Sequence, residues 1–155
     1  MKYVNTSVVF QEIPDEVTLS INISNCPCHC LGCHSDYLWE DIGEPFNAMS
    51  LDVMLKEYGE DITCVAFMGG DAEPQEVDAL AAWTKKHYPH LKVAWYSGRV
   101  ECSKAIHVKN FDFIKLGPYV ATMGPLNKPT TNQRLYKVEK DLSLTDITEK
   151  FWKKK

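Results

Sequence analysis

Four cysteines lie within one short segment of the chain, at Cys26, Cys28, Cys30 and Cys33. Three of them, Cys26, Cys30 and Cys33, have the spacing C-x3-C-x2-C. Thiolates are the natural protein ligands of iron in iron–sulfur clusters, and three of them from one loop can hold three corners of a cubane cluster. The spacing therefore predicts a 4Fe–4S cluster with Cys26, Cys30 and Cys33 as its metal ligands.

A cluster with only three cysteine ligands leaves one iron open to another molecule. An open iron can chelate the amino and carboxylate groups of S-adenosylmethionine, and one electron can then cleave the carbon–sulfur bond beside the cluster to give a 5′-deoxyadenosyl radical. Such chemistry belongs to the cofactor, whereas the protein positions and shields it. We therefore expect S-adenosylmethionine as a second cofactor and a catalytic role for the three cysteines.

The same segment admits two other interpretations. Cys28 either replaces a neighbour as a ligand or is a bystander, and the tendency of alternate residues to point apart favours the bystander. The thiols, with His29 and His34, also offer enough ligands for a structural zinc ion. Structural zinc sites usually join two separated ligand pairs, whereas these ligands all come from one loop. A non-catalytic zinc-binding interaction module is therefore the alternative.

Composition narrows the class of protein further. The 155 residues suit a single domain, 1–155, and 45% hydrophobic with 25% charged residues is an ordinary globular balance. A net charge of −4 argues against a nucleic-acid partner, and the basic run 153–155 is typical of a solvated tail. The first twenty residues contain neither a signal peptide nor a membrane span, so we expect a cytoplasmic protein with reduced thiols and no membrane partner. The two isolated cysteines, Cys64 and Cys102, are expected to be buried structural thiols.

Hydrophobic patterns predict an alternation of strands and helices. Apolar runs that alternate or end in glycine predict strands at 17–23, 64–68, 92–96, 111–116 and 135–138. Helices are expected from a cap at Ser50 to a stop at Gly59, from Pro74 to about Tyr88, and over 146–154, where acids come early and lysines late. This order predicts an α/β fold with mostly parallel strands.

Ligands of parallel sheets bind at the carboxyl ends of the strands. The cysteine loop, Gly69-Gly70 and Ser97-Gly98 all follow predicted strands, so we expect them to line one site. A simple turn is the alternative for Gly69-Gly70, and Asp71 or Glu73 could cap the helix that follows. The polar run 132–134 has no obvious core role, which indicates either a ligand contact or a solvated turn.

Together, these motifs resemble those of the activating proteins of the anaerobic ribonucleoside-triphosphate reductase, which are radical S-adenosylmethionine enzymes. The matching segments occur in the family's order and are 25–34, 67–71, 95–98, 117–119 and 132–134. The resemblance implies a shortened, open β/α barrel of the radical S-adenosylmethionine type. It implies that the radical abstracts hydrogen from a glycine of the large reductase subunit, with an unidentified low-potential electron donor. Another glycyl-radical enzyme, of the formate-lyase type, is the alternative target.

The resemblance also implies a cofactor site. Its members would be Gly69, Gly70 and Asp71, and we add Ser97, Asn132 and Arg134 from the other matching segments. One departure affects this assignment, because the family's Gly-Gly-Glu-Pro is Gly-Gly-Asp-Ala-Glu-Pro here. Either Asp71 or Glu73 would therefore replace the family's glutamate.

Overall fold

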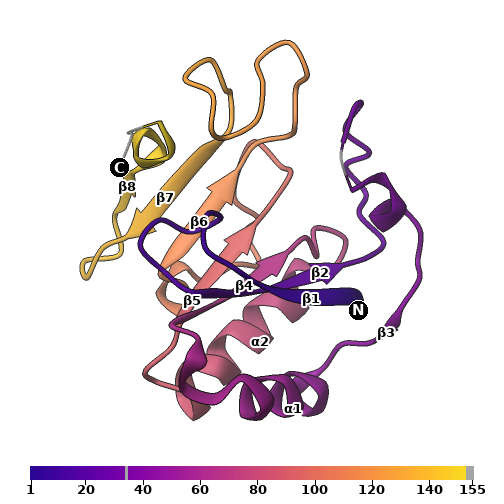
Figure 1. Ribbon diagram of the computed structural model, residues 1–155, viewed down its shortest axis with the longest axis vertical. Coiled ribbons are helices and arrows are strands. Elements are labelled where there is room, and N and C mark those ends of the chain that lie inside the picture. Colours follow the sequence, from indigo (N-terminus) through magenta and orange to yellow (C-terminus); the bar gives the residue numbers. More distant parts are fainter. Residues whose placement is uncertain (34, 153–155) are drawn as a thin grey trace.

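The computed structural model describes residues 1–33 and 35–152, which form an eight-stranded sheet with two α-helices (Figure 1). The strand order across the sheet is β3-β1-β2-β4-β5-β6-β7-β8. The strands are β1 (Lys2–Val9), β2 (Thr18–Ile23), β3 (Glu44–Pro45), β4 (Cys64–Met68), β5 (Lys92–Tyr96), β6 (Phe113–Leu116), β7 (Arg134–Val138) and β8 (Leu144–Asp146), and the helices are α1 (Ala48–Tyr58) and α2 (Pro74–His87).

The sheet is mixed, so the prediction of mostly parallel strands is wrong. The four central strands, β2, β4, β5 and β6, pair in parallel, whereas β1–β2, β1–β3, β6–β7 and β7–β8 pair antiparallel. Connection length explains the difference, because parallel neighbours need a long crossover and antiparallel ones do not. Only a short segment, 10–17, joins β1 to β2, while α1 and α2 lie in the crossovers from β2 to β4 and from β4 to β5.

The two faces of the sheet bury different apolar clusters. Alternate residues of a strand face opposite sides, so Val65 and Phe67 of β4 pack with α1 and α2, whereas Cys64 and Ala66 face the other side. On that second side no α-helix of the described chain contributes to the cluster. It is instead covered by Ile13 from the segment before β2 and by residues near the end of the described chain.

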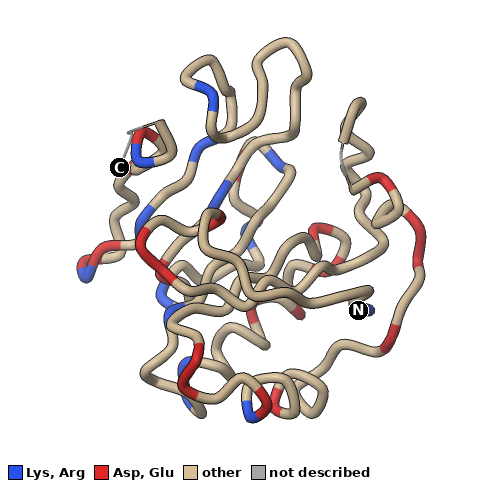
Figure 2. The backbone as a smooth tube through the Cα atoms, in the orientation of Figure 1, with Lys and Arg blue, Asp and Glu red and all other residues tan. Residues whose placement is uncertain are grey.

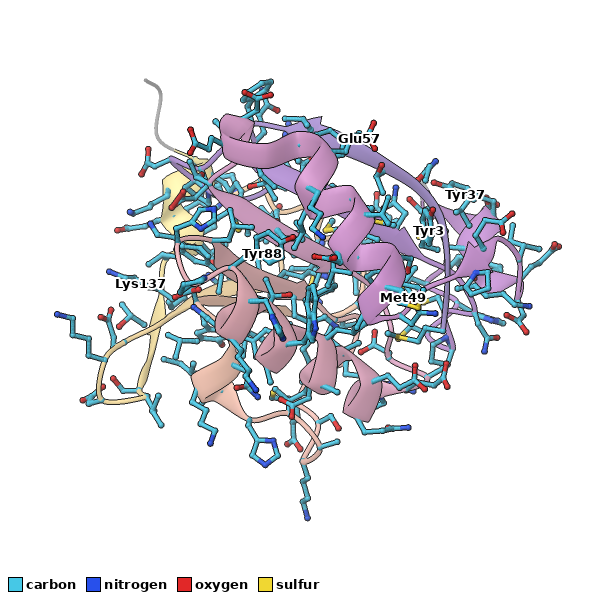
Figure 3. All side chains as sticks on the ribbon, turned by 90° about the horizontal axis from the view of Figure 1, so that it is seen from below. Tyr3, Tyr37, Met49, Glu57, Tyr88 and Lys137 are labelled. Carbon is cyan, nitrogen blue, oxygen red and sulfur yellow. The ribbon has the colours of Figure 1, made fainter. Side chains whose placement is uncertain are left out.

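Local signals set most helix boundaries as expected, with one correction. The cap of α1 is Asn47 rather than Ser50, because Asn47 accepts from the backbone N–H of Ser50 and Ser50 Oγ accepts from that of Asn47. Pro74 begins α2 as predicted. The Tyr88 hydroxyl donates to Asp52 of α1 over 2.6 Å, and Figure 3 shows the two helices side by side at this tyrosine. No helix among the described residues is long and apolar enough to cross a bilayer.

The predicted helix at 146–154 is wrong over its described part. Within this segment Asp146 is the last residue of β8, and Thr148–Phe151 forms a short 3-10 helix instead of a continuous α-helix. Residues 153 and 154, like the rest of the tail 153–155, lie outside the described residues. Buried Thr148 explains this outcome, because its hydroxyl accepts from the Leu135 backbone N–H of β7 and donates to Asp146. These bonds fix the segment against the sheet.

Candidate functional site

The carboxyl ends of the four parallel strands meet at one edge of the sheet. Figure 1 shows the segments that follow β2, β5 and β6 leaving this edge on the same side of the molecule. The cysteine loop, Gly69-Gly70 and Ser97-Gly98 all lie here, as the sequence predicted. The prediction that these three segments come together is therefore confirmed by the fold.

The cysteine loop, residues 25–40, is closed at its base by two backbone hydrogen bonds. The N–H of Asn25 donates to the Glu40 carbonyl over 2.9 Å, and that of Cys26 donates to the Leu38 carbonyl over 2.8 Å. The ring of His29 stacks on that of Trp39 with centroids 4.8 Å apart. His34, a zinc candidate in the sequence, lies outside the described residues. The closed base holds the thiols in one compact loop.

The four thiols of the loop are free and partly exposed. Between Cys30 and Cys33 the backbone turns, with a 3.0 Å hydrogen bond from the Cys33 N–H to the Cys30 carbonyl. The Ser35 N–H donates to Cys33 Sγ over 3.4 Å, as is common for sulfurs that ligate iron clusters. Among the described residues, no three cysteine, histidine or acidic side chains already converge on one metal position. The donor set suits a cluster, which the thiols would have to rotate to bind.

Asp71 links β4 to β5 and to the cysteine loop. One carboxylate oxygen accepts from the Ser97 hydroxyl over 2.6 Å, and the other accepts from the Gly98 N–H over 2.9 Å. Cys28 Sγ lies 3.6 Å from that second oxygen. Burial and the adjacent Asp71 carboxylate raise the pKa of Cys28 to about 12, which keeps this thiol protonated. Asp71 and Ser97 are thus engaged with each other, and their contact with a cofactor stays a prediction.

Gly69 and Gly70 form the turn that leaves β4. Gly69 donates to the Tyr96 carbonyl over 3.1 Å and accepts from the Trp95 indole over 2.7 Å. Both glycines have positive φ, and a Cβ atom at Gly70 would lie 2.4 Å from Val77 of α2. Glycine is therefore required here for packing, and a ligand contact by these residues stays a prediction.

Lys115 of β6 is a buried cation at the same edge. Its ammonium group donates to the carbonyls of Ser97 and Gly117 over 3.2 and 2.8 Å. Burial lowers the pKa of Lys115 to about 8, against the opposing effect of Asp71 and of the thiols of the cysteine loop. Lys115 and Cys33 of the cysteine loop also line one pocket.

A pocket of about 740 Å³ opens beside Lys115 on the face of the sheet opposite α1 and α2. Its wall includes Cys33 from the cysteine loop, Met68 and Tyr96 from the strand ends, and Tyr119 from the segment after β6. The volume lies within the range of small-molecule sites, and the lining combines apolar side chains with a few polar groups as such sites do. The pocket therefore adjoins the thiols that the sequence singled out.

The polar run 132–134 lies beside this edge, but the side chains of Asn132 and Arg134 bond within the protein. Asn132 donates to the Pro118 carbonyl over 3.0 Å, while its side-chain oxygen is buried without a hydrogen-bond partner in the described part of the chain. Arg134 lies 3.7 Å from Asp146 and over the ring of Trp152. Of the run, only Gln133 lines the pocket. Cofactor binding by Asn132 and Arg134 stays a prediction.

Sequence reasoning missed Lys115 and the contact between Cys28 and Asp71. The signal for Lys115 was present, because a lysine inside an otherwise apolar strand is rarely buried without a purpose. The contact of Cys28 had no such signal, since it joins residues 43 positions apart. Both features depend on how the strands align.

The fold and the loop define an α/β protein with a thiol-rich metal-binding loop at the carboxyl edge of its parallel strands. Comparison with known families is more specific: the model of the 4Fe–4S single cluster domain matches residues 16–138. The chain belongs to this family, and iron–sulfur binding, predicted from the cysteine spacing, is confirmed at that level. No curated protein and no solved structure matches the chain.

Proposed function

We propose that the chain is an iron–sulfur activase that reductively cleaves S-adenosylmethionine and generates a glycyl radical on the anaerobic ribonucleoside-triphosphate reductase. One observation carries the proposal: the C-x3-C-x2-C loop leaves the end of a parallel strand and adjoins a pocket of about 740 Å³. A three-thiol cluster needs space beside it for a molecule that completes its coordination. The pocket supplies that space next to Cys33.

The residues of the chain would divide the work as follows. Cys26, Cys30 and Cys33 bind the cluster, and their thiols rotate on the closed loop to converge on it. When bound, the cluster would supply one-electron reduction of the sulfonium of S-adenosylmethionine, with the electron drawn from a low-potential donor, so that one carbon–sulfur bond breaks and methionine and a 5′-deoxyadenosyl radical are the products. Lys115 places a positive charge on the pocket wall, which suits the carboxylate of that molecule. Met68 lines the same wall and helps to exclude water.

We propose a shortened, open β/α barrel as the fold. Its support is the run of four parallel strands, β2, β4, β5 and β6, with both α-helices of the described residues on the same face. The strand order does not close on itself, since β3 and β8 are at opposite ends of the sheet. An open sheet of this kind leaves the pocket accessible to a protein segment.

The proposed partner is the large reductase subunit, from one glycine of which the radical would abstract a hydrogen atom. Two exposed apolar side chains support a protein partner at this site. Phe10 lines the pocket and is 66% exposed, and Leu31 on the cysteine loop is 87% exposed. Large apolar side chains exposed beside a pocket are typical of surfaces that bind another protein.

The proposal is tested by anaerobic reconstitution of the protein with iron and sulfide. We expect about four irons per chain, a reduced-cluster spin-resonance signal that changes when S-adenosylmethionine is added, and release of 5′-deoxyadenosine. Cys30→Ala should lose cleavage, whereas Cys102→Ala, far along the chain from the loop, should retain it. A colourless protein that holds one zinc ion and cleaves nothing would overturn the proposal.

The target is tested separately by mixing the reduced, loaded protein with candidate partners. We expect a glycyl-radical signal with the large subunit of the anaerobic reductase and none with a formate-lyase-type enzyme. A matched reductase variant without its radical glycine is the control. Signal on the formate-lyase-type enzyme alone would assign the activase to that target instead.

A further inference from the structure

The side chain of Cys28 lies in a defined position beside the end of β5, between Asp71 and Gly98. Its sulfur lies 3.6 Å from Asp71 Oδ2, within the range of hydrogen bonds that involve sulfur. A Cβ atom at Gly98 would lie 2.9 Å from the same sulfur, so the absence of a side chain at Gly98 makes room for it. The thiol is therefore packed against both Asp71 and Gly98.

The acceptor of this contact is held rigidly. Asp71 is only 9% exposed, and its carboxylate is fixed by the Ser97 hydroxyl and the Gly98 N–H. Ser97 is itself anchored, because its N–H donates to the Lys115 carbonyl of β6 over 2.9 Å. A thiol that bonds to such an acceptor ties its own loop to the sheet.

Other points also hold the described part of the cysteine loop in place. Its base is closed by the bonds of Asn25 and Cys26, and a Cβ atom at Gly32 would lie 3.4 Å from the ring of Tyr119. Between Cys26 and Gly32, the side chain of Cys28 forms a hydrogen bond with Asp71, which follows the end of β4. Its position two residues from both Cys26 and Cys30 lets it act on the ligand thiols without being one.

We infer that Cys28 is a positioning residue, whose thiol donates to Asp71 and holds the cysteine loop against the β4–β5 edge before the cluster binds. This inference rests on the proposed assignment of Cys26, Cys30 and Cys33 as the ligands. The tether restricts the loop in the metal-free protein, so less order has to be gained when the cluster assembles. Cys28 thereby differs from its three neighbours in role although not in residue type.

Amide hydrogen exchange of the metal-free protein tests the tether directly. In Cys28→Ala, exchange over residues 26–33 should accelerate roughly three- to tenfold, the factor expected from one lost hydrogen bond. Cys28→Ser keeps a donor and should restore part of the protection. Cys102→Ala removes a partly buried thiol elsewhere and should leave this segment unchanged. Equal exchange in the wild type and Cys28→Ala would overturn the inference.

Gly98→Ala provides a second test that leaves Cys28 intact. Its backbone needs no positive φ, so the added methyl acts mainly by displacing the Cys28 sulfur. We expect faster exchange over 26–33 in this variant, and little further change when it is combined with Cys28→Ala. Additive effects of the two substitutions would contradict the contact between Gly98 and the Cys28 sulfur.

The iron content of the reconstituted variants separates this inference from the proposed function. Cys28→Ala should bind as much iron and sulfide as the wild type at saturation but should lose it faster to a chelator. Cys30→Ala should bind substantially less. An equal loss of iron in both variants would make Cys28 a ligand and overturn the inference, whereas absence of a cluster in the wild type would overturn the proposed function.

Discussion

The carboxylate of Asp71, just after β4, accepts a 2.6 Å hydrogen bond from the hydroxyl of Ser97, just after β5. Ser97 is 1% exposed and Asp71 is 9% exposed, so their mutual hydrogen bond replaces the hydrogen bonds to water that both groups lose on folding. The Ser97 oxygen also accepts from the Arg99 N–H over 3.0 Å. This pair fixes the spacing of two neighbouring strand ends at the edge where the cysteine loop lies.

Replacing Ser97 by alanine should destabilise the metal-free protein. The change removes the hydroxyl donor to a buried carboxylate and leaves the Arg99 N–H without its acceptor. A loss of this kind costs about 1–3 kcal/mol of unfolding free energy. Anaerobic urea denaturation measures it, with Ser7→Ala at an exposed position of β1 as the control that should change little. Equal stability of Ser97→Ala and the wild type would show that the pair contributes nothing.

Gly70→Ala should be more destabilising than Gly59→Ala. Both glycines have positive φ, but only Gly70 is crowded, since its Cβ atom would lie 2.4 Å from Val77 Cγ2 while that of Gly59 meets nothing within 4 Å. Backbone strain costs about 1–3 kcal/mol at either position, and the clash adds about 1–3 kcal/mol at Gly70. The difference in urea midpoints measures the clash. Equal midpoints would mean that Val77 can move aside.

The fold was predictable where the signal was local. Apolar runs that end in glycine marked β4 and β5 at their observed bounds, because a buried parallel strand is apolar on both faces. The segment 146–154 misled, because it has the charge pattern of a helix, whereas the bonds of the Thr148 hydroxyl to Leu135 of β7 and to Asp146 decide the structure of its described part. The strand Lys2–Val9 was missed for a related reason, since its partners β2 and β3 lie elsewhere in the sequence.

The sequence predicted which segments form the site, but it did not predict which side chains contact one another there. Cysteine spacing identified the loop, and the rule for parallel sheets placed Gly69 and Ser97 beside it. Strand alignment, which the sequence does not state, decides that Asp71 bonds to Ser97. It likewise places Lys115 on the face opposite α1 and α2, whereas its apolar neighbour Ile114 packs on the helix side.

Lys115→Met should weaken binding of S-adenosylmethionine to the cluster-loaded protein. Lys115 is proposed to attract the carboxylate of that molecule, and loss of a charged hydrogen-bond donor corresponds to a roughly ten- to hundredfold weaker affinity. Equilibrium binding under anaerobic conditions measures the effect. Lys137→Met is the matched control, because Lys137 is exposed on β7 (Figure 3) and lines no part of the pocket. Unchanged affinity in Lys115→Met would remove Lys115 from the site.

Acidic side chains along one margin of the molecule should make partner binding depend on salt. Figure 2 shows acids recurring along the segment that runs from the cysteine loop toward α1, and the exposed ones are Asp36, Glu40, Asp41 and Glu44. A partner that binds near the cysteine loop would interact electrostatically with these carboxylates, and added salt would weaken that interaction. Replacing Glu40 and Asp41 by their amides should reduce the salt dependence of the association rate with the reductase subunit. An unchanged salt dependence would place the partner elsewhere.

Asp78 of α2 gives a prediction for the dependence of stability on pH. Burial opposes ionisation of its carboxyl, but hydrogen bonds from the His107 backbone, the His107 ring and Asn110 outweigh burial and lower the pKa below its ordinary value of 3.8. A carboxyl with a lower pKa in the folded state binds fewer protons there than when unfolded. Its stabilisation is therefore present above the ordinary value and is lost as the pH falls through the folded value.

Asp78→Asn should accordingly reduce the unfolding free energy by about 1–2 kcal/mol at neutral pH, because the charged acceptor of three hydrogen bonds is lost. The difference from the wild type should narrow as the pH falls below 3.8 and through the lower pKa of the folded state, where the folded wild-type carboxyl also becomes neutral. Urea denaturation of the metal-free protein across this range measures both effects. Glu57→Gln, on the exposed side of α1 (Figure 3), is the control for a general loss of charge. A difference that stayed constant with pH would mean that the introduced amide destabilises by its shape rather than through the lost charge.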